Sequence, residues 1–268
     1  MLFRSAALAI RQAEWHRDAM EKRTMETEMG IAREIQSHLL PGRCPVVDGW
    51  DLAAFCKSCQ AVGGDYYDAF MYNDRLVIVI GDVAGKGVAA ALLMAGVHAA
   101  LHAPFMMNVS LPPAERIAYI NQFVRDSAPH SRFVTFFYAE VDPGTGSIWY
   151  VNAGHNPPFA LLPDGTPAVL PRGGLPLGVQ AHGLFQAAEM TLQPGQALVL
   201  YTDGISEAMN EEQEEFGEAR LLATIRSVAA GSAQDMVDTL LLRVEQFRGA
   251  AAPNDDQTLL VIKRLSFS

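Results

Sequence analysis

The sequence predicts an α+β protein that begins with one long helix and continues as a domain of antiparallel strands and helices. The segment Leu2–Leu40 contains no proline and only one glycine, and its many Ala, Glu, Arg, Met and Gln residues favour a helix. The runs Phe133–Val141 and Ser147–Asn152 are rich in β-branched and aromatic residues, and the short turn between them makes the two strands antiparallel. Two amphipathic helices are expected near residues 217–229 and 233–247.

Composition places the chain among globular proteins and excludes several functions. Half of its 268 residues are hydrophobic, 19% are charged and the formal net charge is −10. This acidic balance argues against a nucleic-acid-binding surface, which needs basic stripes. Three cysteines are too few for a disulfide framework, so we expect a reducing, cytoplasmic compartment. The apolar stretch Ala6–Ile10 is too short to cross a membrane, and we expect no membrane insertion.

The N-terminal helix is too long to pack wholly on one domain, because it would extend more than about 50 Å. Part of it has the spacing of a coiled-coil seam, with steps of four and three residues. The seam consists of Met25, Met29, Ala32, Gln36 and Leu39. Asp18 and Lys22 interrupt it upstream, and Pro41-Gly42 ends the helix. We expect residues 1–45 to form a linker that joins two chains in a homodimer, and residues 46–268 to form the globular domain.

The stretch Leu76–Met94 combines a buried strand, a glycine-rich turn and a helix, and Asp82 lies where the strand ends. A nucleotide-binding P-loop has a similar layout, but it has four residues between its first glycine and the Gly-Lys pair, and here only three intervene. Gly87 also stands where a P-loop has Ser or Thr. We therefore favour a metal-binding strand end, in which the Asp82 carboxylate and the Val83 carbonyl hold Mg²⁺ or Mn²⁺. The alternative is a turn aspartate without a ligand.

Four aspartates share this setting, because each stands at a strand end beside a glycine or another aspartate. They are Asp65, Asp82, Asp203 and Asp255. A hairpin around Asn73-Asp74 would bring Asp65 close to Asp82. An all-carboxylate set favours two hard ions over zinc, and two such ions are a recurring device for attack on phosphorus by activated water.

The cysteines offer an alternative metal site. Cys56 and Cys59 have ligand spacing, and His38 with Cys44 could complete a zinc site. No second cysteine pair exists, and Cys56 lies in an apolar strand, so we favour buried free thiols.

The remaining candidates are histidines and one aspartate. His98 and His102 stand four apart on one helix, which is metal-ligand spacing, but we favour surface or hydrogen-bonded histidines because no Glu accompanies them. His155 is either a general acid or a residue that holds its Gly/Pro-rich loop, and we favour the second role. Asp68 is either part of the site or a solvated turn residue.

Six blocks of the sequence resemble, in order, the motifs of the metal-dependent protein phosphatases of the PPM type. The blocks are VGGDYYD, IGDVAGKG, NAGHNPP, LPLGV, LYTDGISEA and DDQTLLV. Within that class they are similar to the bacterial SpoIIE-like and RsbU-like branch. The resemblance covers about Val46 to Leu265, and the preceding AREIQSHLLP resembles the linker helix of the same branch.

The resemblance implies a four-layer α-β-β-α sandwich of two antiparallel sheets and serine/threonine phosphoprotein hydrolysis with two Mn²⁺ or Mg²⁺ ions. It implies a ligand set of Asp65, Asp82, the Val83 carbonyl, Asp203 and Asp255, with Asp82 and Asp65 central to catalysis. Asp256 competes with Asp255 for the last position. The phosphate-clamping arginine of eukaryotic relatives has no clear counterpart, although Lys57 is near in sequence.

For partners, the resemblance implies a phosphorylated substrate similar to anti-anti-sigma factors and an upstream sensory or receiver domain. A non-catalytic regulatory module on the same fold is the alternative. Intact carboxylates weigh against it, because a scaffold has no reason to keep four of them together.

Overall fold

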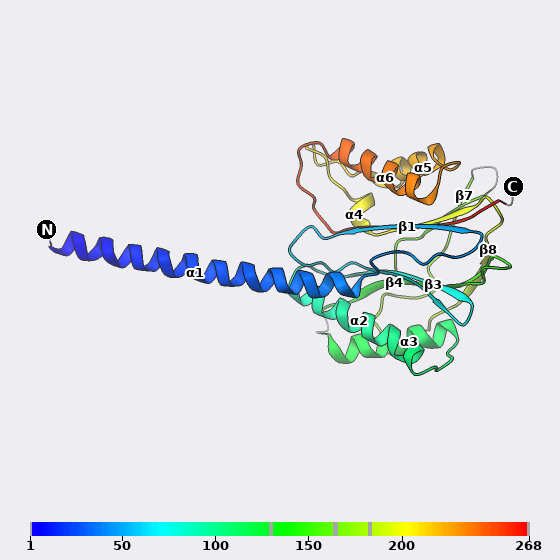
Figure 1. Cartoon of the computed structure of the whole chain (residues 1–268), viewed down its shortest axis with the longest axis horizontal. Helices are drawn as coiled ribbons and strands as arrows, with labels where there is room; N and C mark the ends of the chain where they lie inside the picture. The colour runs from blue at the N-terminus through cyan, green and yellow to red at the C-terminus, as the bar shows by residue number, and fades with distance from the viewer. Residues whose placement is uncertain (1, 129–130, 163–165, 182–183, 267–268) are drawn as a thin grey trace.

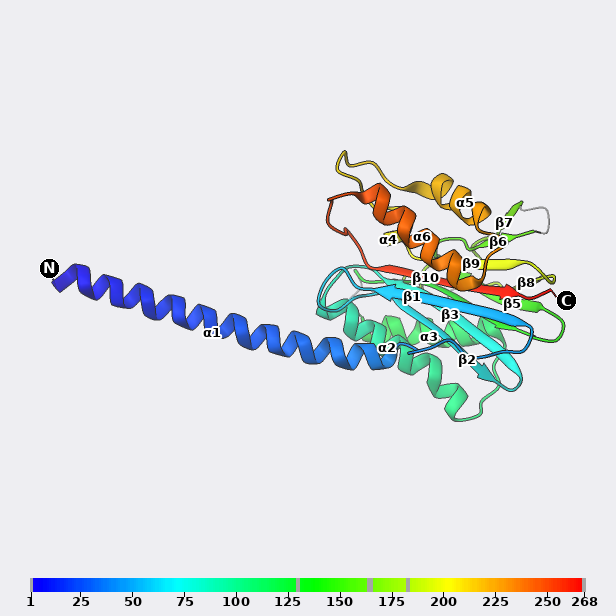
Figure 2. The same ribbon diagram turned by 45° about the horizontal axis from the view of Figure 1, so that its top comes forward.

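The long helix α1 (Leu2–Leu39) leads into a sandwich of two five-stranded sheets (Figure 1). The computed structural model describes residues 2–128, 131–162, 166–181 and 184–266. Only the C-terminal part of α1 lies against the sandwich, and the rest projects away from it (Figures 1 and 2). The expected linker helix is therefore present, and it ends one residue earlier than the sequence predicted.

Within each sheet, the neighbouring strands named below pair in antiparallel fashion. The first sheet contains, in spatial order, β1 (Trp50–Lys57), β10 (Gln257–Arg264), β9 (Ala197–Tyr201), β6 (Phe159–Leu161) and β7 (Pro167–Val169). The second contains β2 (Tyr66–Tyr72), β3 (Arg75–Val83), β4 (Val134–Val141), β5 (Ser147–Ala153) and β8 (Ala188–Thr191). The chain starts in the first sheet with β1 and then forms β2 to β5 of the second. It adds β6 and β7 to the first sheet and β8 to the second, and it completes the first with β9 and β10.

Helices cover the outer face of each sheet (Figure 2). The second sheet is covered by α2 (Val88–Met106) and α3 (Pro113–Ser127). The first is covered by α4 (Asp203–Ser206), α5 (Gly217–Ser227) and α6 (Ala233–Arg248). The order of layers is therefore helix, sheet, sheet, helix, which confirms the architecture that the resemblance implied.

Strand β3 shows why the central run of the sequence is apolar at every position. Leu76, Ile78 and Ile80 point into the core between the two sheets. Val77 and Val79 point the other way, into the core under α2 and α3. Since these five side chains are at most 1% exposed, both faces of the strand are buried and a polar alternation is absent.

The short elements were the hardest to predict. Strand β7 was missed, because its three residues carry too little pattern to be recognised. Helix α2 contains Pro104 and continues past it to Met106. The β2–β3 hairpin was predicted correctly, and Asn73 and Asp74 both have positive φ (46° and 61°), as a tight type I′ turn requires.

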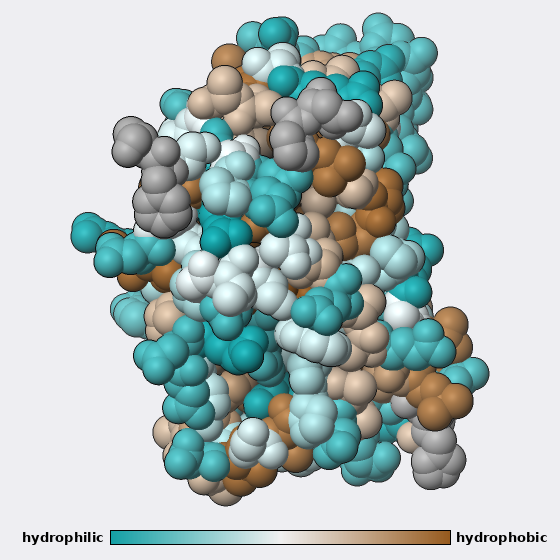
Figure 3. All heavy atoms as spheres, turned by 90° about the vertical axis from the view of Figure 1, so that its right-hand side faces the viewer, coloured by the Kyte–Doolittle hydropathy of each residue, from teal (hydrophilic) through white to brown (hydrophobic). Residues whose placement is uncertain are grey.

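One helix among the described residues, α2, is long and apolar enough by composition to cross a membrane. Its side chains Leu93, Met94 and Leu101 pack into the core against the second sheet, so α2 is a core helix of the domain. The end of the domain away from α1 shows hydrophilic residues interspersed with small groups of hydrophobic ones (Figure 3).

Candidate metal centre

Four segments that carry aspartates meet at the end of the sandwich from which α1 projects. Asp65 directly precedes β2, and Asp82 lies in β3 of the same sheet. Asp203 opens α4 directly after β9, and Asp255 precedes β10 of the other sheet. The site therefore straddles the two sheets. The structure brings the segments that carry the predicted ligands to this end. Among the described residues, the groups of three ligand atoms within 4.8 Å of one another include only Asp255 of the four aspartates.

Close backbone approach holds these segments in place and requires glycine at two positions. A Cβ on Gly64 would lie 2.9 Å from the Val83 carbonyl oxygen, and a Cβ on Gly204 would lie 1.8 Å from the Asp256 carbonyl oxygen. Gly64 therefore lets the turn before Asp65 contact the end of β3. Gly204 likewise lets α4 contact the Asp255-Asp256 segment.

Asp65 is buried and connects the two sheets. Its Oδ2 accepts hydrogen bonds from Thr202 Oγ1 at 2.8 Å and Thr258 Oγ1 at 2.6 Å, and both threonines belong to the other sheet or its end. Among the residues that the structure describes, Oδ1 has no hydrogen-bond donor. Burial, followed by the Asp82 charge, raises the pKa of Asp65 well above its usual range despite the two hydroxyl donors. A cation at Oδ1 would offset both effects.

The pKa of Asp82 is also affected by neighbouring carboxylates. Burial raises its pKa to about 7, and the next contributions are the charges of Asp203 and Asp255. The pKa of Asp203 is raised by burial and then by Asp255. These mutual effects place the three carboxylates within electrostatic reach of one another. Such crowding is costly unless a cation neutralises it.

The structure distinguishes the two adjacent aspartates before β10. Asp256 is buried, and its carboxylate accepts the backbone N–H of Cys59 at 2.8 Å and that of Gly64 at 2.7 Å. Asp255 is partly exposed, and its Oδ2 lies 2.9 Å from Lys86 Nζ. Asp256 therefore holds the loops of the site together, whereas Asp255 faces the other carboxylates. This division favours Asp255 over Asp256 as the ligand.

Sequence reasoning missed four supporting residues. Thr202 and Thr258 stand within the TDG and DDQT motifs, so their proximity to the aspartates was the available signal. Lys86 was weighed only as a P-loop lysine. The structure turns its ammonium group to Asp255 and to the Asn254 carbonyl, which leaves the P-loop interpretation without support. Arg132 Nη1 donates to the Ala84 carbonyl at 3.1 Å, beside the same loop.

Lys57, which the sequence offered in place of a phosphate-clamping arginine, lies away from the carboxylates. It ends β1 and lines a hollow with Arg248 and Gln257 on the α6 side. The described residues of that hollow include none of the four carboxylates. Lys86 is therefore the lysine at the site.

His155 has a structural role. It is buried, Thr135 Oγ1 lies 2.9 Å from its Nδ1, and the Tyr201 carbonyl lies 3.1 Å from its Nε2. The carbonyl only accepts, so Nε2 carries the proton and Nδ1 accepts from the threonine hydroxyl. Burial lowers the pKa of His155 to about 3, which keeps the ring neutral. The ring joins the two sheets, as the loop-holding interpretation predicted.

The cysteine alternative is not formed. Cys44, Cys56 and Cys59 are free, and burial raises the pKa of Cys56 to about 12. His38 bonds to the Glu34 carbonyl of its own helix. Among the described residues, the only cysteine in a cluster that could hold a metal is Cys59, with Asp255 and Asp256. The thiols therefore fit the interpretation as free cysteines.

The donor set fits hard divalent ions. Four carboxylates and one carbonyl supply oxygen ligands only, which is the chemistry that Mg²⁺ and Mn²⁺ select. Their negative charges already oppose one another, so a cation would stabilise the arrangement.

The fold resembles solved PP2C-type phosphatase domains. The SiaA-PP2C domain of Pseudomonas aeruginosa matches with a TM-score of 0.81 at 22% identity, covering 91% of this chain and 98% of that chain. The RsbU and RsbW domains of Rv1364c from Mycobacterium tuberculosis match with a TM-score of 0.73 at 30% identity, covering 86% and 64%. The domain therefore has the fold of PP2C-type phosphatase domains.

The sequence profile of Stage II sporulation protein E (SpoIIE) matches residues 72–265, and the chain belongs to this family. Phosphoserine phosphatase RsbU of Bacillus subtilis is 29% identical over 244 residues, covering 90% of this chain and 71% of RsbU. Protein IcfG of Synechocystis is 29% identical, but the chain spans only 42% of its length. The profile begins after Asp65, so this ligand position lies outside the matched range.

Proposed function

We propose that this chain is a metal-dependent serine/threonine phosphoprotein phosphatase that acts in bacterial signalling. The observation that carries the proposal is the convergence of Asp65, Asp82, Asp203 and Asp255 at one end of the sandwich. Membership of the SpoIIE family and likeness to a phosphoserine phosphatase support it.

Each residue of the site has a definable task in this proposal. The four aspartates and the Val83 carbonyl would hold two Mg²⁺ or Mn²⁺ ions. When bound, such ions polarise a phosphoryl oxygen and lower the pKa of water so that it attacks phosphorus. Thr202 and Thr258 fix the Asp65 carboxylate from the opposite sheet. Lys86 orients Asp255 and places a positive charge beside the ligands. No serine or cysteine nucleophile is needed.

The test is Mn²⁺-dependent hydrolysis of a phosphoprotein or an aryl phosphate by the chain and by Asp82→Asn. Loss of a central carboxylate should remove several kcal/mol of transition-state stabilisation, so hydrolysis should fall below detection while the circular dichroism spectrum persists. Asp238→Asn is a matched control, because Asp238 is exposed on α6 and far from the motifs. Full activity of Asp82→Asn at saturating Mn²⁺ would contradict the proposal. A wild type that binds Mn²⁺ and hydrolyses neither substrate would support the regulatory-module alternative.

The proposed substrate is a phosphorylated regulatory protein similar to anti-anti-sigma factors, and the proposed location is the cytoplasm. The names of RsbU and of the RsbU and RsbW domains of Rv1364c support this kind of signalling role. The three free cysteines fit a reducing compartment. An upstream sensory or receiver domain is the proposed source of control.

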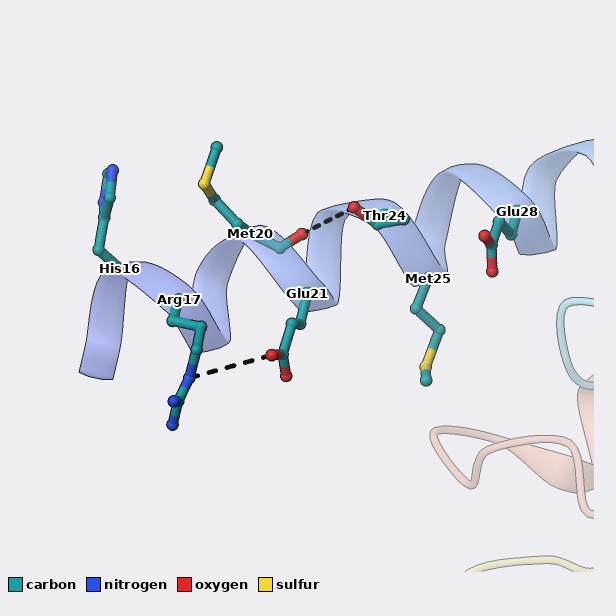
Figure 4. Close-up of a pocket in the computed structure, with 7 residues that line it drawn as sticks. All are labelled: His16, Arg17, Met20, Glu21, Thr24, Met25 and Glu28. Atoms are coloured by element: carbon teal, nitrogen blue, oxygen red, sulfur yellow. Dashed lines mark hydrogen bonds and ion pairs between the residues drawn. The ribbon is translucent and has the colours of Figure 1, made fainter. Parts of the chain in front are cut away.

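We further propose that α1 joins two chains in a homodimer. Figure 4 shows its free part, where Met20 and Met25 project away from the helix and Arg17 pairs with Glu21 along its surface. Met20 and Met25 are 62% and 65% exposed, and Ile31 and Ile35 are also exposed. Burial of these apolar groups against a second helix would favour association.

The C-terminal part of the predicted seam is not available to a second chain, because Gln36 contacts the chain's own domain. The partner helix must therefore meet the exposed face that carries Met20, Ile31 and Ile35, because Met25 lies on the same side of the helix as Gln36. Light scattering tests this with Ile31→Glu combined with Ile35→Glu, which should convert a dimer into a monomer. Glu26→Gln, also exposed on α1, is the control. A wild-type monomer, or a dimer unaffected by the double substitution, would refute dimerisation through this face.

A further inference from the structure

A second group of metal-binding side chains lies between β2 and α2, apart from the carboxylate centre. It consists of Asp68, which sits in the middle of β2, and His98 and His102, which stand one turn apart on α2. One ligand atom from each lies within 4.8 Å of the other two. Asp68 follows Asp65 by three positions along extended chain, a distance of about 10 Å. The group is therefore distinct from the proposed catalytic ions.

The pleat of β2 explains why these residues meet. Tyr66 packs into the core under α2, whereas Tyr67 and Ala69 pack into the core between the sheets. Side chains alternate along a strand, so Asp68 points to the α2 side with Tyr66. Of the two interpretations of Asp68, the solvated turn residue is thus wrong, because Asp68 is 5% exposed within a regular strand.

The carboxylate of Asp68 is oriented toward the histidines. Its Oδ1 accepts the backbone N–H of Ala69 at 2.8 Å. Its Oδ2 lies 2.7 Å from His102 Nε2 and accepts the Tyr66 hydroxyl at 2.8 Å. The same hydroxyl oxygen lies 3.3 Å from His98 Nδ1. One oxygen is thus held by the backbone, and the other faces both imidazoles.

The two rings stand against each other with a centroid separation of 4.5 Å. The His102 ring and the Tyr66 hydroxyl hydrogen-bond to the carboxylate, whereas the one hydrogen-bond contact of His98 among the described residues is the long one with Tyr66. Burial, followed by the neighbouring His102, lowers the pKa of His98, and the neutral ring is the form that ligates metals. Two imidazoles beside a buried carboxylate are a ligand set for a borderline-soft ion.

We propose that Asp68, His98 and His102 bind one divalent transition-metal ion of the zinc type. Zinc bonds of about 2.0–2.2 Å place tetrahedral ligand atoms about 3.3 Å apart. The 2.7 Å contact between Asp68 Oδ2 and His102 Nε2 would therefore open slightly as the ion takes the place of the hydrogen bond, and the His102 ring would hold its single N–H proton on Nδ1. Three protein ligands leave a fourth position for water. The two imidazoles distinguish this site from the oxygen-only centre, which prefers Mg²⁺ or Mn²⁺.

A metal here would fasten α2 to β2. Helix α2 begins five residues after Val83, so only a short loop separates it from the end of β3, which carries the two proposed ligands Asp82 and Val83. The inference does not depend on the proposed phosphatase activity, because it concerns a separate set of residues and is tested by binding.

The test uses the untagged full chain with Co²⁺ as a spectroscopic probe and Zn²⁺ in calorimetry, both in excess Mg²⁺ to occupy the oxygen-only centre. We expect one Zn²⁺ per chain and a Co²⁺ spectrum with nitrogen ligation. The ring proton resonances of His98 and His102 should be shifted by Co²⁺. Combined His98→Asn and His102→Asn should weaken Zn²⁺ binding by more than about tenfold. His16→Asn, exposed on α1, is the matched control and should bind as the wild type does.

Circular dichroism checks that the double variant folds. If it does not, His98→Gln decides, because it removes one ligand and keeps the Asp68–His102 contact. Unchanged Zn²⁺ affinity in the folded variant, or no Zn²⁺ binding by the wild type in excess Mg²⁺, would overturn the proposal.

Discussion

The two neighbouring aspartates Asp255 and Asp256 illustrate how differently one residue type can act at adjacent positions. Asp256 accepts two backbone N–H groups and is buried, whereas the side chain of Asp255 contacts Lys86 Nζ and accepts the Asp256 N–H. The first arrangement determines the shape of the site, and the second leaves a carboxylate available to a cation. Sequence alone could not separate them, because both belong to one motif.

Asp256→Asn should therefore cost stability, and Asp255→Asn should cost metal affinity. An asparagine at 256 would turn its amide NH₂ group toward one of the two buried N–H donors. The free energy of unfolding should therefore fall by about 1–3 kcal/mol. An asparagine at 255 relieves charge crowding, so the unfolding free energy should stay the same or rise while Mn²⁺ binding weakens. Urea unfolding and Mn²⁺ calorimetry on both variants measure the difference. The reverse pattern would identify Asp256 as the ligand.

His155 predicts a specific pH dependence of stability. Its pKa is about 3 in the folded chain and about 6.5 when unfolded, so the unfolded state binds more protons between these values. Stability from this group is complete above pH 6.5 and falls by roughly 1.4 kcal/mol per pH unit below it. His155→Gln should flatten the slope of unfolding free energy between pH 6.5 and 5. His16→Gln should leave the slope unchanged. Equal slopes for wild type and His155→Gln would contradict the neutral, buried assignment.

At the scale of elements, the last turns of α1 are bound to the loop that precedes Asp65. Gln36 Nε2 donates to the Gly63 carbonyl at 2.7 Å, and the Gly63 N–H donates back to Gln36 Oε1 at 3.0 Å. Arg33 Nε donates to the Ala61 carbonyl at 2.8 Å. The next residue, Gly64, donates to Asp256. A movement of α1 would therefore reach two segments of the metal centre through backbone contacts.

Gln36→Ala should weaken this connection. It leaves the buried N–H and carbonyl of Gly63 without their partners, at a cost of about 1–3 kcal/mol. We expect a lower unfolding free energy and weaker Mn²⁺ binding. Ser37→Ala is the control, because the Ser37 hydroxyl bonds only to Glu34 within the helix. If Gln36→Ala matches the control in both measurements, α1 does not influence the centre through Gly63.

The elements show which features the sequence could predict. Long periodic or continuous apolar segments were placed within a few residues, since burial on one or both faces determines their pattern. Which strands share a sheet was available only through the resemblance, because β1 pairs with β10 across almost the whole domain. The Asp68–His98–His102 group also depends on this packing. Its aspartate lies in a strand and its histidines in a helix, with no shared motif.

At the scale of the whole molecule, metal binding should stabilise the fold. Carboxylates that repel one another become ligands, so Mn²⁺ at 100 times its dissociation constant should add about 2.7 kcal/mol. For a domain of this size that corresponds to a rise in Tm of about 5–11 °C. Thermal melts with EDTA and with increasing Mn²⁺ measure it. Asp82→Asn should respond much less. A midpoint that does not move at any Mn²⁺ concentration in the wild type would contradict a shared metal centre.

The residues of the metal centre are synthesised at different times, because the chain alternates between the two sheets. Asp65 and Asp82 emerge early, but their partners Thr258 and Asp255 arrive with β10, which follows every other described element. Until then β1 has no neighbour in its sheet, because its only strand partner is β10. A nascent or truncated chain that stops before β10 can therefore neither close the first sheet nor assemble the centre. The chain can therefore bind metal at this centre only after β10 has been synthesised.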